Sequence, residues 1–107
     1  MAKRGKLPRH YRWIESEYPA VARAYGRLGD AVHAAGPLDE RTRAIAKLGI
    51  SVGAGFEGAV HAQVRKAREA GVTRDDILHV TLLAVPTIGW PATAAALSWV
   101  RDILDAR

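Results

Sequence analysis

Apolar residues recur along this chain at alternating spacings of three and four, the pattern of helices that bury one face. The longest such stripe predicts a helix from about Tyr18 to Ala35, which the pair Gly36-Pro37 ends. The stripe consists of Tyr18, Val21, Tyr25, Leu28, Val32 and Ala35. Asp39 is placed to begin a second helix that extends to about residue 52. Its shared apolar face consists of Ile45, Leu48 and Val52.

Three further helices follow in the second half of the chain. One is predicted over about residues 56–70, and Gly71 suits the left-handed position after its end. Thr73, followed three residues later by an acid, resembles a capping box that begins a helix over about residues 74–85. That helix is apolar nearly all round, which predicts burial on several sides. Pro91 fits the first turn of a last helix.

No strand pattern stands out, so the sequence predicts an all-α fold, a bundle of five or six helices with short connections. Residues 11–14 form either a short helix or part of an arm. We expect a basic N-terminal arm over residues 1–15 and one helical domain over residues 16–107. The last two helices carry more apolar surface than a small bundle covers, which favours a homo-oligomer.

The positive charge is concentrated at the N-terminus. The formal net charge is +5, and four basic residues before Tyr11 contribute most of it. These are Lys3, Arg4, Lys6 and Arg9. Such an arm can touch nucleic acid or an acidic partner, but a solvated terminus is the commoner case, so we do not expect nucleic acid as the partner. No apolar run follows the basic start, so it does not resemble a secretory signal.

One long stretch without charged residues invites comparison with a membrane span. Residues 77–100 contain no Asp, Glu, Lys or Arg, and this length can cross a bilayer. Pro86, Gly89 and Pro91 divide the stretch, however, and threonines interrupt it. We therefore predict two core helices here and no membrane insertion.

Gln63 is the only carboxamide side chain in the chain, since there is no asparagine and no other glutamine. On a helical wheel it lies near the centre of the apolar face of the helix over residues 56–70. A polar amide buried without partners costs roughly 1–3 kcal/mol. Gln63 therefore marks either a small polar pocket in the core or the remnant of one.

Cysteine is absent, which excludes disulfides, thiol catalysis and thiolate metal sites. A reducing cytoplasm fits this composition. The remaining candidates for chemistry must therefore be sought among histidines, acids and lysines.

The segments 38–43, 55–61 and 67–77 resemble the carboxymuconolactone decarboxylase and alkylhydroperoxidase D-like superfamily. The most specific part is a helix ending in Ala-x-x-x-Gly, followed by Thr, two acids and Ile. The resemblance covers roughly residues 18–105. It implies an all-helical subunit that assembles into larger rings, and among these a trimer or a hexamer is expected.

In the peroxidase branch of that superfamily, a C-x-x-C-x-x-x-H motif with an upstream glutamate carries the chemistry. Aligned on Gly71, the two cysteines fall on Phe56 and Ala59, the histidine on Gln63 and the glutamate on Ala44. All four roles are vacant, so this chain cannot act as a thiol peroxidase by itself. We expect no cofactor.

The decarboxylase branch uses no cysteine and relies on polar and acid–base residues around the same helix. Gln63 can donate and accept hydrogen bonds but cannot transfer protons near neutral pH. His61 and Glu57 lie four residues apart on one helix, so a Glu-oriented histidine can act as general base. The alternative is a surface pair beside arginines with no catalytic role. His61, Glu57 and His79 also suggest a metal-ligand set, but nothing fixes their convergence, and we expect no metal.

Four more residues are candidates for substrate binding around Gln63. Lys47 falls one turn beyond Ala44 and can present a cation to a substrate carboxylate, although a surface lysine explains it too. Phe56 occupies the position of a cysteine in the peroxidase branch. Thr87 and Trp90 lie at the corner before the last helix.

The sequence thus favours a carboxymuconolactone decarboxylase-like, cofactor-free enzyme, either of lyase type or acting on a lactone or carbon acid, whose substrate the sequence does not identify. Its predicted catalytic residues are His61 and Glu57, and Gln63 is the predicted polar anchor. The alternative is a non-enzymatic oligomeric module, small-molecule-binding or structural, with a degenerate site.

Overall fold

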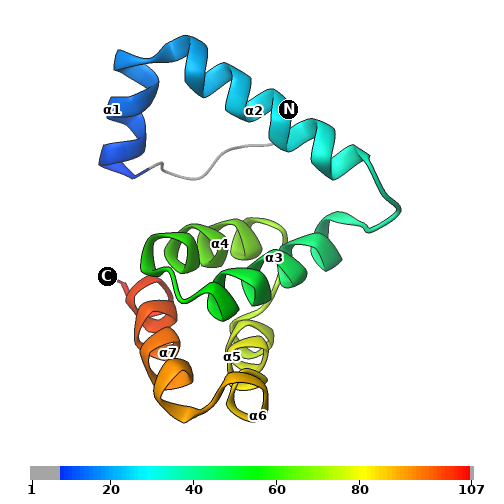
Figure 1. Ribbon diagram of the computed structural model, residues 1–107, viewed down its shortest axis with the longest axis vertical. Helices are drawn as coiled ribbons and strands as arrows, with labels where there is room; N and C mark the ends of the chain where they lie inside the picture. The colour runs from blue at the N-terminus through cyan, green and yellow to red at the C-terminus, as the bar shows by residue number, and fades with distance from the viewer. Residues whose placement is uncertain (1–7, 107) are drawn as a thin grey trace. The chain divides into compact units, whose positions relative to one another are not determined.

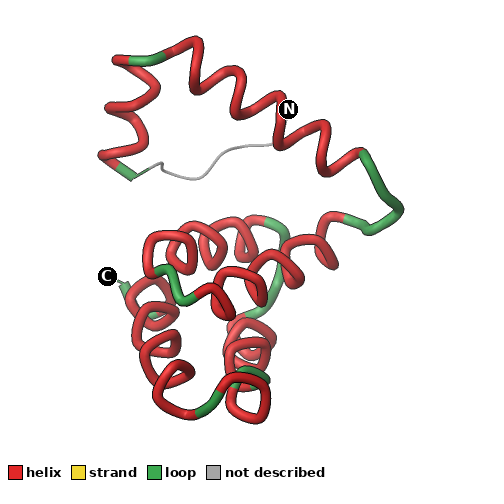
Figure 2. Tube along the Cα trace, viewed as in Figure 1, coloured by secondary structure: helices red, strands yellow, loops and turns green. Residues whose placement is uncertain are grey.

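The structure is a computed structural model that describes residues 8–106. Every regular element in this range is a helix, which confirms the all-α prediction (Figures 1 and 2). The helices are α1 (Arg9–Glu17), α2 (Pro19–Ala34), α3 (Glu40–Ala54), α4 (Glu57–Glu69), α5 (Arg74–Leu82), α6 (Val85–Ile88) and α7 (Trp90–Leu104). The chain divides into two compact units, Met1–Leu38 and Asp39–Arg107.

The first unit contains α1 and α2, which pack against each other. Of the two predictions for residues 11–14, the helix is confirmed, because they lie in α1. Three of the basic residues of the predicted arm, Lys3, Arg4 and Lys6, lie outside the described residues. Pro19 occupies the first turn of α2, where its missing N–H has no cost. The boundary that we expected at residues 15 and 16 stays a prediction.

The apolar stripe of α2 is exposed. The helix has nearly the predicted bounds, yet neither α1 nor α2 contains a buried residue. Five members of the stripe are 56% to 62% exposed, namely Tyr18, Val21, Tyr25, Leu28 and Val32. The periodicity correctly indicated a helix with an apolar face, but nothing described within the first unit buries that face.

The second unit begins and turns at the residues that the sequence indicates. The Asp39 carboxylate accepts a hydrogen bond from the Thr42 N–H at 2.8 Å, and this caps α3. The Thr73 hydroxyl accepts from the Asp76 N–H at 3.1 Å at the start of α5, as the capping box predicts. Gly71, with a φ of 83°, allows the left-handed turn after α4.

The core of the second unit lies between four helices. α4 packs against α3 and α7, α5 contacts these same two helices, and α4 and α5 also touch each other (Figure 1). The largest side chains with no exposure are Leu48, Ile77, Val60, Val64 and Val100. This arrangement fixes the side chains of α4 relative to both α3 and α7.

The charge-free stretch differs from the prediction in one respect. α5 ends at Leu82, and α6 follows as a separate turn with Pro86 at its start. Exposed apolar side chains here are Leu82, Leu83, Ile88 and Trp90. Only some of the apolar side chains in this stretch are therefore buried within one subunit. In residues 8–106, no helix combines the length and the apolarity needed to cross a membrane.

Candidate functional site

Gln63 is a polar residue beside the core, at an edge rather than at the centre of the buried face. The buried residues of α4 are Val60, Val64 and Ala67, and Gln63 itself is only partly buried. Phe56, which we expected on the buried face, is 67% exposed. The Oε1 atom of Gln63 is nevertheless inaccessible and accepts no hydrogen bond from any residue in the described range. It is an acceptor without a donor, as the sequence led us to look for.

The border of α4 toward α3 carries positive charge. Lys47 on α3 is partly buried, and its pKa is lowered, first by burial and then by the charges of Lys66 and Arg43. Lys66 lies on α4 one turn after Gln63. Burial and the two cationic neighbours thus both disfavour the charged form of Lys47.

The border of α4 toward α7 carries a histidine–aspartate pair. His61 Nε2 lies 3.0 Å from Asp102 Oδ2 of α7, and the two side chains are 21% and 57% exposed. About two turns further along α4, Arg68 Nη1 donates to the carbonyl of Ile103 at 3.3 Å. Among the described residues no hydrogen bond or ion pair joins His61 to Glu57, which is exposed.

His61 and Gln63 face different helices. They are two residues apart on α4, so their side chains diverge by about 200° around the helix axis. His61 meets α7, whereas Gln63 lies on the side of α4 that carries Lys66. One subunit therefore brings His61 to Asp102 but does not bring it to Gln63.

The other predicted site residues lie at the surface. Phe56 is the residue before α4, and Trp90 begins α7 with 60% exposure. The Thr87 hydroxyl donates to the Leu83 carbonyl at 2.8 Å, a bond within its own segment. His79 is exposed on α5. No group of three or more histidine and acidic side chains in residues 8–106 is placed to hold a metal ion.

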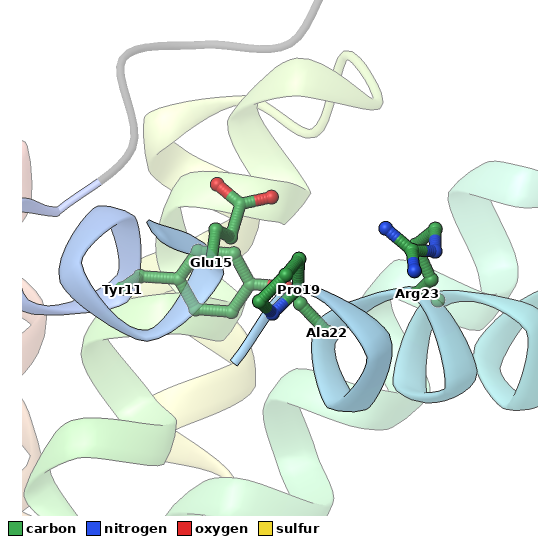
Figure 3. A pocket seen from close by; sticks show the side chains of 6 residues that line it. Tyr11, Glu15, Pro19, Ala22 and Arg23 are labelled. Carbon is green, nitrogen blue, oxygen red and sulfur yellow. The ribbon is translucent and has the colours of Figure 1, made fainter. Parts of the chain in front are cut away.

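An open hollow of about 300 Å³ lies in the first unit and contains none of the predicted site residues. Its lining consists of Tyr11, Glu15, Pro19, Ala22, Arg23 and Gly26. Figure 3 shows the ring of Tyr11 extending toward Pro19, with the charged groups of Glu15 and Arg23 apart from each other. The hollow is a gap between two helices with no convergent set of reactive groups.

Asp102 is the residue that sequence reasoning missed. It lies 41 positions after His61, so no spacing rule for a single helix connects them. The sequence indicated only that α7 has an apolar face and must pack on another helix. It did not indicate which residues of the two helices would lie side by side.

Fold and site together define a small, cysteine-free, all-helical protein whose polar side chains gather along two borders of one central helix. The chain belongs to the carboxymuconolactone decarboxylase family, with a match that spans residues 19–102. It is similar to the uncharacterised protein MJ0742 of Methanocaldococcus jannaschii, with 28% identity over 91 residues, 84% of this chain and 88% of that protein. No solved structure matched the chain.

Proposed function

We propose that the protein is a cofactor-free, carboxymuconolactone decarboxylase-like enzyme, either of lyase type or acting on a lactone or carbon acid, and that it works through His61. The observation that supports this proposal is the 3.0 Å contact between His61 Nε2 and Asp102. A histidine held by a carboxylate is a common arrangement of a general base. In this proposal Asp102 takes the orienting role that the sequence suggested for Glu57, which stays a candidate for contact with substrate.

The pairing determines which ring nitrogen can act. An ionised carboxylate only accepts hydrogen bonds, so Nε2 carries the proton, and Nδ1 of the neutral imidazole has the free lone pair. In this proposal Nδ1 takes a proton from the water that attacks a lactone and returns it to the ring oxygen that leaves, or it takes the proton of a carbon acid; in a decarboxylation, the imidazolium form protonates the carbon from which CO₂ departs. Asp102 stabilises the imidazolium in each case.

Thiol chemistry has no place in this reaction. The chain has no cysteine, and the two cysteine positions of the redox branch are Phe56 and Ala59. Gln63 at the third position binds by hydrogen bonds and transfers no proton near neutral pH.

The test is turnover of a panel of carboxylated lactones and β-keto acids, followed by CO₂ release, and of simple lactones, followed by proton release. We expect His61→Gln to lower turnover by roughly 100-fold or more, the usual contribution of a general base. His79→Gln, the same change at an exposed histidine of α5, is the matched control and keeps wild-type activity. Equal rates for wild type and His61→Gln on every active substrate would exclude His61 as the base.

A non-enzymatic oligomeric module is the second candidate. It is favoured by the divergence of His61 and Gln63, because a single small ligand cannot touch both within one subunit. On this alternative the purified oligomer turns over no member of the panel, and the polar border near Gln63 serves binding alone.

We also propose that the chain forms a homo-oligomer, a trimer or a hexamer by family resemblance, in the cytoplasm. The support is that α1 and α2 have an apolar stripe but no buried residue. A helical hairpin without a core is unstable by itself, so another surface must cover the stripe.

A further inference from the structure

Arg65 is a partly buried cation of α4 to which no hydrogen bond or ion pair is made within residues 8–106. The other arginines described between residues 39 and 106 all interact with another group. Those with a defined acceptor are Arg41 with Asp76, Arg68 with the carbonyl of Ile103, and Arg74 and Arg101 with Asp105. A charged group that is partly withdrawn from water without an acceptor is unfavourable. The guanidinium of Arg65 therefore has donors to offer to a bound group.

Arg65 lies one turn after His61 on the same helix. Residues four apart on a helix are neighbours, with Cβ atoms about 5–6 Å apart. Side chains before and after Arg65 reach the last turn of α7, since His61 Nε2 lies 3.0 Å from Asp102 and Arg68 Nη1 lies 3.3 Å from the carbonyl of Ile103. Around the helix axis, Arg65 is within about 60° of both His61 and Arg68. It therefore belongs to the same border of α4 as the proposed base.

The reactions proposed for His61 share a requirement that the His61–Asp102 pair does not meet. Attack of water on a lactone, removal of a proton from a carbon acid and loss of CO₂ from a β-keto acid each move an electron pair onto a carbonyl oxygen. The pair carries one negative charge while the imidazole is neutral, and it is only uncharged once the imidazole has taken a proton. Stabilisation of the oxyanion therefore requires a separate donor or cation.

We propose that Arg65 stabilises this oxyanion, by donating hydrogen bonds to the substrate's carbonyl oxygen as negative charge develops there. The inference rests on the proposed function of His61. In lactone opening, the oxyanion forms the carbonyl again and expels the ring oxygen, which takes the proton held by Nδ1. In decarboxylation, the enolate forms the carbonyl again as its carbon takes that proton. Arginine suits this role because it stays charged and presents several donors in one plane.

Turnover of the same substrate panel tests the role of Arg65 in two ways. Removal of one oxyanion donor costs roughly 10²–10³ in kcat, so Arg65→Met should lose about this much with little change in KM. Arg68→Met removes a cation from the same helix that already has an acceptor, and as the matched control it should keep kcat close to that of the wild type. Added guanidinium at low concentration should restore part of the rate of Arg65→Ala, which a merely structural loss would not allow.

A second measurement requires no substrate. 4-Nitrophenol ionises near neutral pH and its phenolate absorbs visible light, so a titration gives the affinities of both forms. We expect the wild type to bind the phenolate on the order of tenfold more tightly than the phenol, as a hydrogen bond to a charged group allows. Arg65→Met should bind the two forms equally. His61→Gln should keep the preference, because it retains Arg65. Circular dichroism of each variant establishes that it is folded.

Three results would overturn the proposal. The first is a wild type that does not prefer the phenolate, and the second is a preference that Arg68→Met lowers as much as Arg65→Met does. The third is turnover that is lost in His61→Gln but kept in Arg65→Met, which would leave His61 as the base without Arg65. Failure of the proposed function gives a different pattern. His61→Gln would then keep the turnover of the wild type, while the preference for phenolate would still depend on Arg65.

Discussion

Replacement of Gln63 by leucine is expected to stabilise the ligand-free protein. The Oε1 atom is buried and has no donor among residues 8–106, and an unsatisfied buried acceptor costs roughly 1–3 kcal/mol. Leucine has a similar volume and lies beside Val60 and Val64, which have no exposure. Because Gln63 is only partly buried, we expect the lower part of that range, a gain of about 1–2 kcal/mol in the free energy of unfolding.

Urea unfolding at fixed protein concentration measures this gain, with circular dichroism and tryptophan fluorescence as independent probes. The concentration must be fixed because association would itself change the apparent stability. For a unit of this size, 1 kcal/mol corresponds to roughly 4–8 °C in Tm. Gln63→Ala removes the acceptor but leaves its space empty. Its free energy of unfolding should therefore be lower than that of Gln63→Leu.

A lower unfolding free energy for Gln63→Leu without ligand would refute the reasoning. It would show that water or another donor satisfies Oε1 in solution.

Three other predictions follow from the described contacts. Leu28→Glu on the exposed stripe of α2 should lower the mass measured by sedimentation, whereas Asp30→Lys on the opposite side of the helix should not. Asp102→Asn should shift the tautomer of His61, seen in its ¹⁵N ring shifts, and lower kcat more than it raises KM; unchanged ring shifts would remove Asp102 from the mechanism. Asp39 has a lowered pKa because the Thr42 N–H donates to it, so its stabilisation is present above the unfolded pKa and lost as pH falls through the folded one. Asp39→Ala should therefore lower the free energy of unfolding at neutral pH, and that free energy should then fall less steeply than the wild type's as the solution is acidified. An equal dependence on acid pH in the two proteins would contradict this.

The helix ends were predictable because their signals are local. Asp39 and Thr73 cap helices with bonds to residues three positions on, and Gly71 takes the one backbone conformation that other residues avoid. The helix predicted over residues 56–70 is observed as Glu57–Glu69. Each of these signals lies within a few residues of the feature that it determines.

What covers each apolar face could not be predicted in the same way. The spacing of Val21 and Leu28 predicts a helix with one apolar side, but spacing contains no information about the surface that meets it. The same limit explains the exposed Leu83 and Trp90, which the composition of their segment placed in a core. Periodicity describes a face, and only tertiary or quaternary contacts decide whether it is buried.

The histidine shows why local pairing rules were misleading at the site. His61 and Glu57 have the spacing of a helical pair, which contributes only a few tenths of a kcal/mol. α7 packs on α4 and brings Asp102 to His61, and this tertiary contact replaces the local one. The polar border toward α7 is a product of helix register, which sequence patterns do not specify.

The position of α4 between these borders decides how its two candidate roles can be separated. The resemblance aligns Gln63 with the histidine of the peroxidase branch, whereas the proposed base is His61, and a helix about 10 Å across stands between the groups. The absence of any turnover that depends on His61 would favour the non-enzymatic module. Turnover that is lost in His61→Gln and kept in Gln63→Leu would identify an enzyme whose base is His61. Since each variant alters one border only, the pair of measurements distinguishes the two functions without knowledge of the natural substrate.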